Sequence, residues 1–396
     1  MTVSTRERID QVKPVSTSAP LRSWWQSFFA FVLYLIVAIA VLEGYFRIAG
    51  IGQQEFLQPD LIIGCHHIPG KVVTWRLEGY SCDRFNADGL RDSEHNLVKP
   101  PGVFRIALLG DSATESMQVN MNETYGKVLE AMLNERYATK PFFSAGKPFN
   151  KFEVINFGCS SYSTGQELFE YKHHVLKYHP DAVVVLFNRG DTAENCLNLK
   201  AKDSPEPRPY FFLGQSGSVQ TDDTVLQANY DKLAPNPPLD FLRANSRIYG
   251  VFSQANLSLS LTDSRFRKFR SWLDRTTAMF SGKPLLRTTS LTYPQQDELQ
   301  VTSTLVKTFA SQVKENGQSF ILLIFPNMGH DPYFAKQTDM LSQMARKDGF
   351  GYLDLTAKFV DSKRPTDNFL WYHFSPTGHR LVAEQLFVLI SNNKQD

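Results

Sequence analysis

The feature that most constrains the fold is an apolar run at residues 106–109, closed by the corner Gly110-Asp111-Ser112. Four consecutive apolar residues before a turn are typical of a strand buried on both faces, as in parallel sheets. Ligands bind at the carboxyl ends of such strands, so we expect the Ser112 hydroxyl to face a cleft. Asp and Ser are also common helix caps, so the corner alone leaves a purely structural role open.

Similar strand patterns recur along the chain. Residues 152–157 run into Gly158 and a loop of small residues, and residues 181–187 run into Asn188. Further strands are predicted at 319–325 and 351–355, and helices at 124–136, 164–178, 296–315, 338–347 and 377–390. Strands and helices in alternation predict an α/β fold with a parallel sheet and crossover helices. Residues 200–292 interrupt this alternation with clustered prolines and are predicted to be an insertion.

Residues 24–42 form a mostly apolar run, broken only by Gln26 and Ser27, that is just long enough to cross a bilayer as a helix. Trp24 and Tyr45 stand near its ends, where aromatic residues favour the membrane interface. No convincing small-residue cleavage site follows, so the pattern predicts an uncleaved signal anchor. The basic N-terminal tail is then cytoplasmic, and the main domain is periplasmic or extracellular. A buried helix of a soluble protein is the alternative.

These patterns divide the chain into four predicted parts. A cytoplasmic tail (1–22) precedes a transmembrane anchor (23–46) and an extracytoplasmic lead-in segment (47–100). The main α/β domain follows at 101–391, with the insertion at about 200–292. The apolar share of 42% supports a large core, and the formal net charge of +2 gives no indication of a nucleic-acid partner.

The four cysteines form no CxxC pair, so no zinc ribbon is expected. A local Cys65–Cys82 disulfide in an oxidising compartment and four free thiols are both left open. Cys65-His66-His67 offers metal-ligand residue types, but neighbouring side chains on a strand point to opposite sides, so we expect no metal there. The basic aromatic residues 264–270 suit contact with anionic lipid or glycan, or else a solvated helix face.

The residue types of acyl-transfer chemistry gather at one predicted sheet edge. A serine hydroxyl becomes a good nucleophile when a base takes its proton, and imidazole is the usual base. His373 precedes the last predicted helix, and Ser112 follows the first strand of the sheet. A satisfied loop histidine is the alternative for His373.

This arrangement resembles the SGNH, or GDSL-type, hydrolase superfamily over residues 101–200 and 300–391. The first block is matched with Ser112 at the nucleophile position, and the last with His373 at the base position. His379 follows at the family's spacing and is expected on the helix surface. The resemblance implies a three-layer α/β/α sandwich with a mostly parallel sheet, here with one N-terminal transmembrane helix. It also implies that no metal or organic cofactor is needed.

The chain departs from the family pattern in three blocks. The second-block glycine falls on Ser161, whose backbone N–H can still serve as an oxyanion donor, and Gly158 of the same loop is expected as a further oxyanion donor. The third-block asparagine falls on Gly190, with Asn188 two residues away as a substitute oxyanion donor or a mere turn residue.

The triad aspartate of the family falls on Leu370 in this chain. Asp367 can reach His373 only if the loop folds back. The alternative is a Ser–His dyad in which a backbone carbonyl orients the imidazole ring.

The sequence therefore predicts a serine esterase or O-acyltransferase that acts on an acylated cell-surface glycan. Its expected partners are the membrane, an acylated polysaccharide or other ester, and other envelope-biosynthesis proteins, but no nucleic acid. The alternative is a catalytically inactive SGNH-like domain that binds glycan or scaffolds a membrane assembly. The absent aspartate and the displaced asparagine favour that alternative.

Overall fold

The computed structural model describes residues 24–52, 55–197, 206–228, 237–262 and 297–392. The chain divides into two compact units, Met1–Ile51 and Gly52–Asp396. The first contains helix α1 (Trp24–Ala49), which is long and apolar enough to cross a membrane and buries none of its residues. The predicted N-terminal apolar helix is therefore confirmed.

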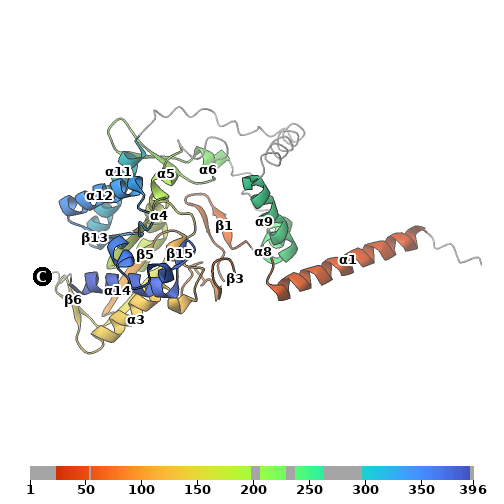
Figure 1. The fold of residues 1–396 in the computed structure, drawn as a ribbon, viewed down its shortest axis with the longest axis horizontal. Helices are drawn as coiled ribbons and strands as arrows, with labels where there is room; N and C mark the ends of the chain where they lie inside the picture. The colour runs from red at the N-terminus through yellow and green to blue at the C-terminus, as the bar shows by residue number, and fades with distance from the viewer. Residues whose placement is uncertain (1–23, 53–54, 198–205, 229–236, 263–296, 393–396) are drawn as a thin grey trace, which may run out of the picture. The chain divides into compact units, whose positions relative to one another are not determined.

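A five-stranded sheet in which all neighbouring strands are parallel forms the centre of the second unit (Figure 1). In spatial order its strands are β13 (Gly351–Asp354), β12 (Ser319–Ile324), β9 (Ala182–Phe187), β5 (Val103–Leu109) and β8 (Lys151–Asn156). All residues of β5 and β9 are buried, as expected for strands covered on both faces.

The strand order reverses between β5 and β9. From β5 the chain passes outward to β8 and then returns to the other side of β5 as β9. The two strands run in register, with Ile106 opposite Ala182 and Leu109 opposite Val185. Their carboxyl ends therefore meet at the switch point where open α/β sheets bind ligands, and Ser112 and Asn188 come just after these ends.

Successive strand residues point to opposite faces, so the sheet has two cores. Leu108 belongs to one buried cluster and Leu109 to the other. Helices cover both faces: α3 (Tyr125–Tyr137), α13 (Thr356–Val360) and α14 (Pro376–Asn392) on one, and α4 (Thr164–Glu170), α11 (Glu298–Glu315) and α12 (Pro332–Asp348) on the other. The predicted three-layer α/β/α sandwich is confirmed (Figure 1).

The predicted helix 164–178 is not one regular helix. The α-helix α4 ends at Glu170 and continues as a π-helical segment, Tyr171–Val175, and a 3₁₀ turn, Leu176–Tyr178. His179 then adopts a left-handed φ of +52°, directly before Pro180. Proline cannot continue a helix, which explains the end, while the wider π turn changes the direction of the side chains after Glu170.

The lead-in segment folds into two antiparallel hairpins, β1 (Leu57–Asp60) with β2 (Gly64–His67), and β3 (Val72–Trp75) with β4 (Ser81–Arg84). The buried Arg91 attaches this segment to the turn after α2 (Ser112–Glu115), where its guanidinium donates to the carbonyls of Glu115, Ser116 and Val119. The same guanidinium pairs with Asp83.

The remaining described elements are short or lie within residues 200–292. They are η1 (Met121–Glu123), β6 (Phe142–Ser144), β7 (Lys147–Phe149), α5 (Asp191–Asn195), β10 (Tyr210–Leu213), β11 (Val219–Asp222), α6 (Thr224–Ala228), α8 (Pro237–Asn245), α9 (Arg247–Thr262), η4 (Pro365–Asn368), β14 (Phe369–Leu370) and β15 (His373–Phe374). The basic aromatic residues 264–270 lie outside the described residues.

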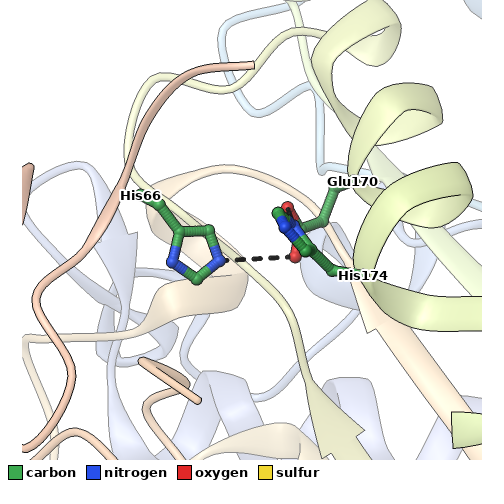
Figure 2. A group of neighbouring side chains, drawn as sticks. All are labelled: His66, Glu170 and His174. Atoms are coloured by element: carbon green, nitrogen blue, oxygen red, sulfur yellow. Dashed lines mark hydrogen bonds and ion pairs between the residues drawn. The ribbon is translucent and has the colours of Figure 1, made fainter. Parts of the chain in front are cut away.

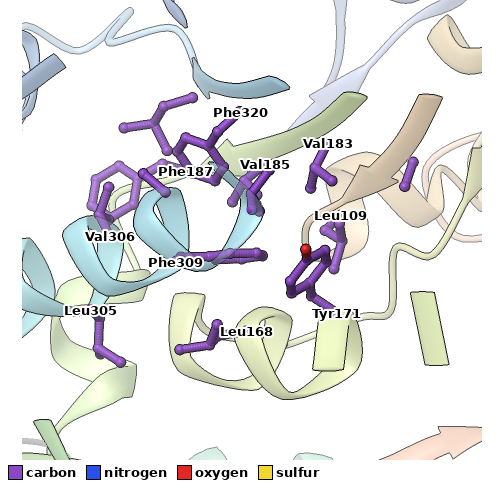
Figure 3. Close-up of a cluster of buried hydrophobic side chains, with 14 of the residues drawn as sticks. Leu109, Leu168, Tyr171, Val183, Val185, Phe187, Leu305, Val306, Phe309 and Phe320 are labelled. Atoms are coloured by element: carbon purple, nitrogen blue, oxygen red, sulfur yellow. The ribbon is translucent and has the colours of Figure 1, made fainter. Parts of the chain in front are cut away.

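Phe309 of α11 lies at the centre of one core (Figure 3). Its ring is fully buried, with its centroid 5.3 Å from that of Tyr171 and 5.3 Å from that of Phe320. It therefore joins α11 both to the sheet and to the helical segment after α4.

We expect Phe309→Ala to lower the free energy of unfolding by about 3–5 kcal/mol, because it leaves a cavity in a close-packed core. The matched control is Phe143→Ala, since the Phe143 side chain is 56% exposed and its loss should change stability by less than about 0.5 kcal/mol. Chemical unfolding of the full chain in detergent measures both values. Equal losses for the two variants would contradict the assigned core.

Candidate active site

Ser112 is the first residue of α2, directly after β5. Asp111 caps this one-turn helix, and its Oδ1 accepts a hydrogen bond from the Ala113 N–H at 2.9 Å. Gly110 allows the sharp corner, because its φ is +157° and an added Cβ would lie 2.1 Å from Thr114 Oγ1. The corner thus presents a partly exposed serine hydroxyl at the switch point of the sheet.

His373 lies on β15 and joins Ser112 to an acidic residue. Its Nε2 is 2.8 Å from Ser112 Oγ, and its Nδ1 is 2.6 Å from Glu78 Oε2. An ionised carboxylate only accepts hydrogen bonds, so Nδ1 carries the hydrogen and Nε2 accepts from the serine hydroxyl. The three side chains form one continuous chain of hydrogen bonds.

Glu78 comes from the turn between β3 and β4, and sequence reasoning did not find it. Its side chain is 12% exposed, and 295 residues separate it from His373 along the chain. The next residue, Gly79, packs so closely that an added Cβ would lie 2.2 Å from the Gln118 carbonyl oxygen and 3.1 Å from Leu370 Cδ1. The turn that carries Glu78 therefore packs against Leu370, the position at which the SGNH pattern has its aspartate.

Asp367 lies elsewhere in the last block. Its carboxylate is 3.6 Å from Arg364 Nη1 and half exposed, while its backbone carbonyl accepts from Ser375 Oγ. The ring nitrogen of His373 that an acidic partner would bind is engaged by Glu78. The structure thus brings Ser112 and His373 together, but with Glu78 rather than Asp367 beside the imidazole.

The loop after β8 approaches α2 through Gly158. An added Cβ on Gly158 would lie 2.5 Å from the Glu115 backbone nitrogen, so only glycine allows this contact. Its N–H donates to Asn156 Oδ1 at 2.9 Å, which gives the amide an acceptor within its own loop. Ser161 is exposed at the following turn, with a left-handed φ of +65°.

Asn188, rather than Gly190, reaches the serine corner from the end of β9. Its side-chain amide donates to Asp111 Oδ2, and its Oδ1 accepts from the Gly190 N–H at 2.5 Å. This hydrogen bond to Asp111 holds the amide of Asn188 next to the corner that carries Ser112. Burial raises the pKa of the Asp111 carboxyl to about 6.

The expectation that His379 lies on the helix surface is wrong. His379 is 1% exposed, its Nδ1 accepts from the Tyr125 N–H at 3.2 Å, and its ring stacks on Tyr125. Burial lowers the pKa of this imidazole to about 3, so it is neutral at physiological pH. His379 lies on the buried face of α14 together with Val382 and Leu386, and this face packs against α3.

The cysteines are free thiols in the structure. Cys65 of β2 shares a hydrogen bond with the buried Cys159, which also lowers the pKa of the Cys65 thiol. Cys82 is exposed on β4, with its sulfur 3.4 Å from Thr74 Oγ1. Of the two alternatives, the structure has the free thiols, and the thiol beside Cys65 is that of Cys159 in the loop after β8 rather than Cys82.

No family model and no curated protein matches this chain. Solved structures match 72% of it, among them a catalytic mutant of an acetylxylan esterase from Geobacillus stearothermophilus (11% identity, TM-score 0.38, 94% of that chain covered). Others are the esterase EstA from Pseudoalteromonas sp. (12%, 0.34, 96%) and a GDSL-like lipase from Bacteroides thetaiotaomicron VPI-5482 (10%, 0.33, 87%). With TM-scores below 0.4, the chemistry of this chain has to be inferred from its own side chains.

Proposed function

We propose that this protein is a serine esterase or O-acyltransferase with Ser112, His373 and Glu78 as its triad. The observation that supports this most directly is the hydrogen-bonded chain from Ser112 Oγ through both ring nitrogens of His373 to Glu78. This is the order of nucleophile, base and orienting group that activates a serine hydroxyl in a catalytic triad.

In the proposed reaction, Ser112 Oγ attacks an ester carbonyl carbon while its proton passes to His373 Nε2. Glu78 stabilises the imidazolium that forms. The tetrahedral intermediate then expels the alcohol, which takes the proton from Nε2, and leaves an acyl-serine. Water or a sugar hydroxyl next gives its proton to His373 Nε2 and attacks the acyl carbon. The bond to Ser112 Oγ then breaks, the serine oxygen takes the proton from Nε2, and the carboxylic acid or the acylated sugar is released.

The developing oxyanion needs donors that point at its position. We assign this role to the backbone N–H groups of Ser112 and Ser161, together with the Asn188 side chain. Gly158 is a weaker candidate than the sequence implies, because its amide already donates to Asn156. The presence of Glu78 also removes one of the two reasons for expecting an inactive domain.

Exposed aromatic side chains next in sequence to His373 and Glu78 favour a glycan as the carrier of the ester. Trp371 and Tyr372, 78% and 69% exposed, precede His373 and stack with ring centroids 5.2 Å apart. Tyr80, two residues after Glu78, is 54% exposed. Flat apolar faces beside a nucleophile suit sugar rings, and exposed apolar groups of this kind commonly mark binding sites.

The anchor α1 places this reaction at a membrane in our proposal. The basic residues before α1 favour a cytoplasmic N-terminus, so residues 52–396 act on the periplasmic or extracellular side. An acylated surface polysaccharide and the proteins that build it are the partners that this location would offer.

A fluorophosphonate probe tests the nucleophile. We expect it to label the full chain in detergent and to stop aryl acetate turnover, because the activated serine oxygen attacks the phosphorus. Ser112→Ala should abolish both, whereas Ser216→Ala, at an exposed turn, should change neither. Wild-type protein that neither reacts with the probe nor hydrolyses aryl acetates would refute the proposed activity.

The acidic residue is tested by comparing Glu78→Gln with Asp367→Asn. We expect Glu78→Gln to lower kcat on the order of 10⁴-fold, because the imidazole loses its orienting carboxylate. Asp367→Asn should leave kcat within about twofold, since an exposed surface substitution has little effect. A large loss in Asp367→Asn alone would assign the acidic role to that residue instead.

The glycan substrate is tested with Trp371→Ala on acetylated oligosaccharides. Loss of one stacking face should raise KM about 3- to 10-fold, which corresponds to about 0.5–1.5 kcal/mol. kcat/KM for a small aryl acetate should stay within about twofold, because that substrate does not need the stacking face. Tyr333→Ala, at an exposed aromatic residue of α12, serves as the control. An equal effect of Trp371→Ala on both substrates would argue against glycan binding there.

A further inference from the structure

A second cluster of functional side chains lies outside the triad, between the lead-in segment and α4. His66 comes from β2, Glu170 is the last residue of α4, and His174 lies in the π-helical segment that follows. Figure 2 shows their side chains pointing toward one another. The ligand atoms of these three residues all lie within 4.8 Å of one another.

The geometry of this cluster fits a metal better than it fits hydrogen bonding alone. His66 Nε2 is 3.6 Å from Glu170 Oε1, which is within the range of an ion pair, drawn as a dashed line in Figure 2, but too long for a hydrogen bond. Two ligand atoms that bind one zinc ion at tetrahedral angles are about 3.3 Å apart. His174 Nδ1 is 2.8 Å from Glu170 Oε2, so a small opening of this pair would bring it to the same separation.

Glu170 itself supplies the second observation. Its side chain is 1% exposed, and among the described residues its Oε1 is a buried oxygen that accepts no hydrogen bond. A buried carboxylate oxygen without a donor is costly, and a cation at this position would remove the cost. The adjoining π-helical segment is a rare conformation that often occurs at functional sites.

The neighbouring cluster of His67, Glu115 and Cys159 provides a useful contrast, because it also brings together metal-ligand residue types. There, His67 bonds through Nδ1 to the Gly89 carbonyl at 2.9 Å and through Nε2 to Glu115 Oε1 at 2.6 Å. The second Glu115 oxygen accepts from Ser160. Both His67 nitrogens and both carboxylate oxygens are thus satisfied, and that cluster has no need of a metal.

We propose that His66, Glu170 and His174 form a zinc site that is separate from the triad. Two imidazoles and one carboxylate are a donor set that Zn²⁺ binds in proteins. His66 and His174 also line a cavity of about 220 Å³, with Asp60, Asp88 and Lys177 among its other walls. The cavity leaves room for water or a small ligand at a fourth position on the metal. A metal here links the lead-in segment, which also carries Glu78, to the helical layer.

Metal binding to the full chain in detergent tests the proposal, after any bound metal has been removed with a chelator. We expect the wild type to bind one Co²⁺ or Zn²⁺ per chain, and Co²⁺ to give the visible absorption of a site with nitrogen and oxygen ligands. Zn²⁺ should displace Co²⁺ and raise the melting temperature. His66→Gln and His174→Gln should each weaken binding by at least about 10- to 100-fold, since even loss of an outer partner has such an effect.

His173→Gln is the matched control, because His173 is an exposed histidine in the same helical segment. It should bind metal like the wild type. Glu170→Gln tests the carboxylate with little change in volume and should also lose the metal. Probe labelling of Ser112 in each variant shows whether the fold is retained, and failure of labelling in the wild type itself would count only against the proposed activity.

Two results would overturn the zinc site. One is a wild type that takes up no stoichiometric metal, which would leave the cluster as an ion-pair and hydrogen-bond group only. The other is a loss of binding in His173→Gln as large as that in His66→Gln and His174→Gln, which would indicate adventitious binding to surface histidines.

Discussion

One buried guanidinium connects the two parts of the chain that form the site. The helix α2 ends after one turn, so its carbonyls need donors from elsewhere. Arg91 donates to the last helical carbonyl, at Glu115, and to the carbonyls of Ser116 and Val119 in the turn that follows, and Ser81 adds a hydrogen bond to the Met117 carbonyl at 2.6 Å. Both donors belong to the lead-in segment. The turn that follows Ser112, the proposed nucleophile, and the segment that carries Glu78 are thus fixed against each other by the same set of bonds.

The residues of the site come from two sources, the α/β/α sandwich and the lead-in segment. The parallel sheet places Ser112 and Asn188 at its switch point, and the hairpin of β14 and β15 adds His373. The acidic residue comes from outside the sandwich, from a hairpin that precedes β5. Leu370 accordingly contributes an apolar surface where the SGNH pattern has a carboxylate, and Gly79 packs against it.

The sequence predicted the features that depend on local patterns. The strands of the sheet and most of the helices follow from apolar runs and helical periodicity, and the positions of Ser112 and Asn188 follow from the strand ends. Glu78 could not be found in this way, because its contact with His373 depends on tertiary packing across 295 residues. The burial of His379 did have a local signal, since it shares helical spacing with Val382 and Leu386. The alternation of His66 and His67 on β2 was anticipated correctly, but their separate partners on other elements were not visible in the sequence.

The position of Glu78 on a hairpin has a consequence for the dynamics of the site. Strands β5 and β9 are buried on both faces and open only with the whole fold, whereas the two-stranded hairpin of β3 and β4 opens at a lower free energy. The fraction of time in which Glu78 stays bonded to His373 therefore depends on the free energy of local hairpin opening, not on the free energy of global unfolding. A sample can be fully folded by every spectroscopic measure of its sheet and still contain a fraction of molecules in which Glu78 has moved away from His373.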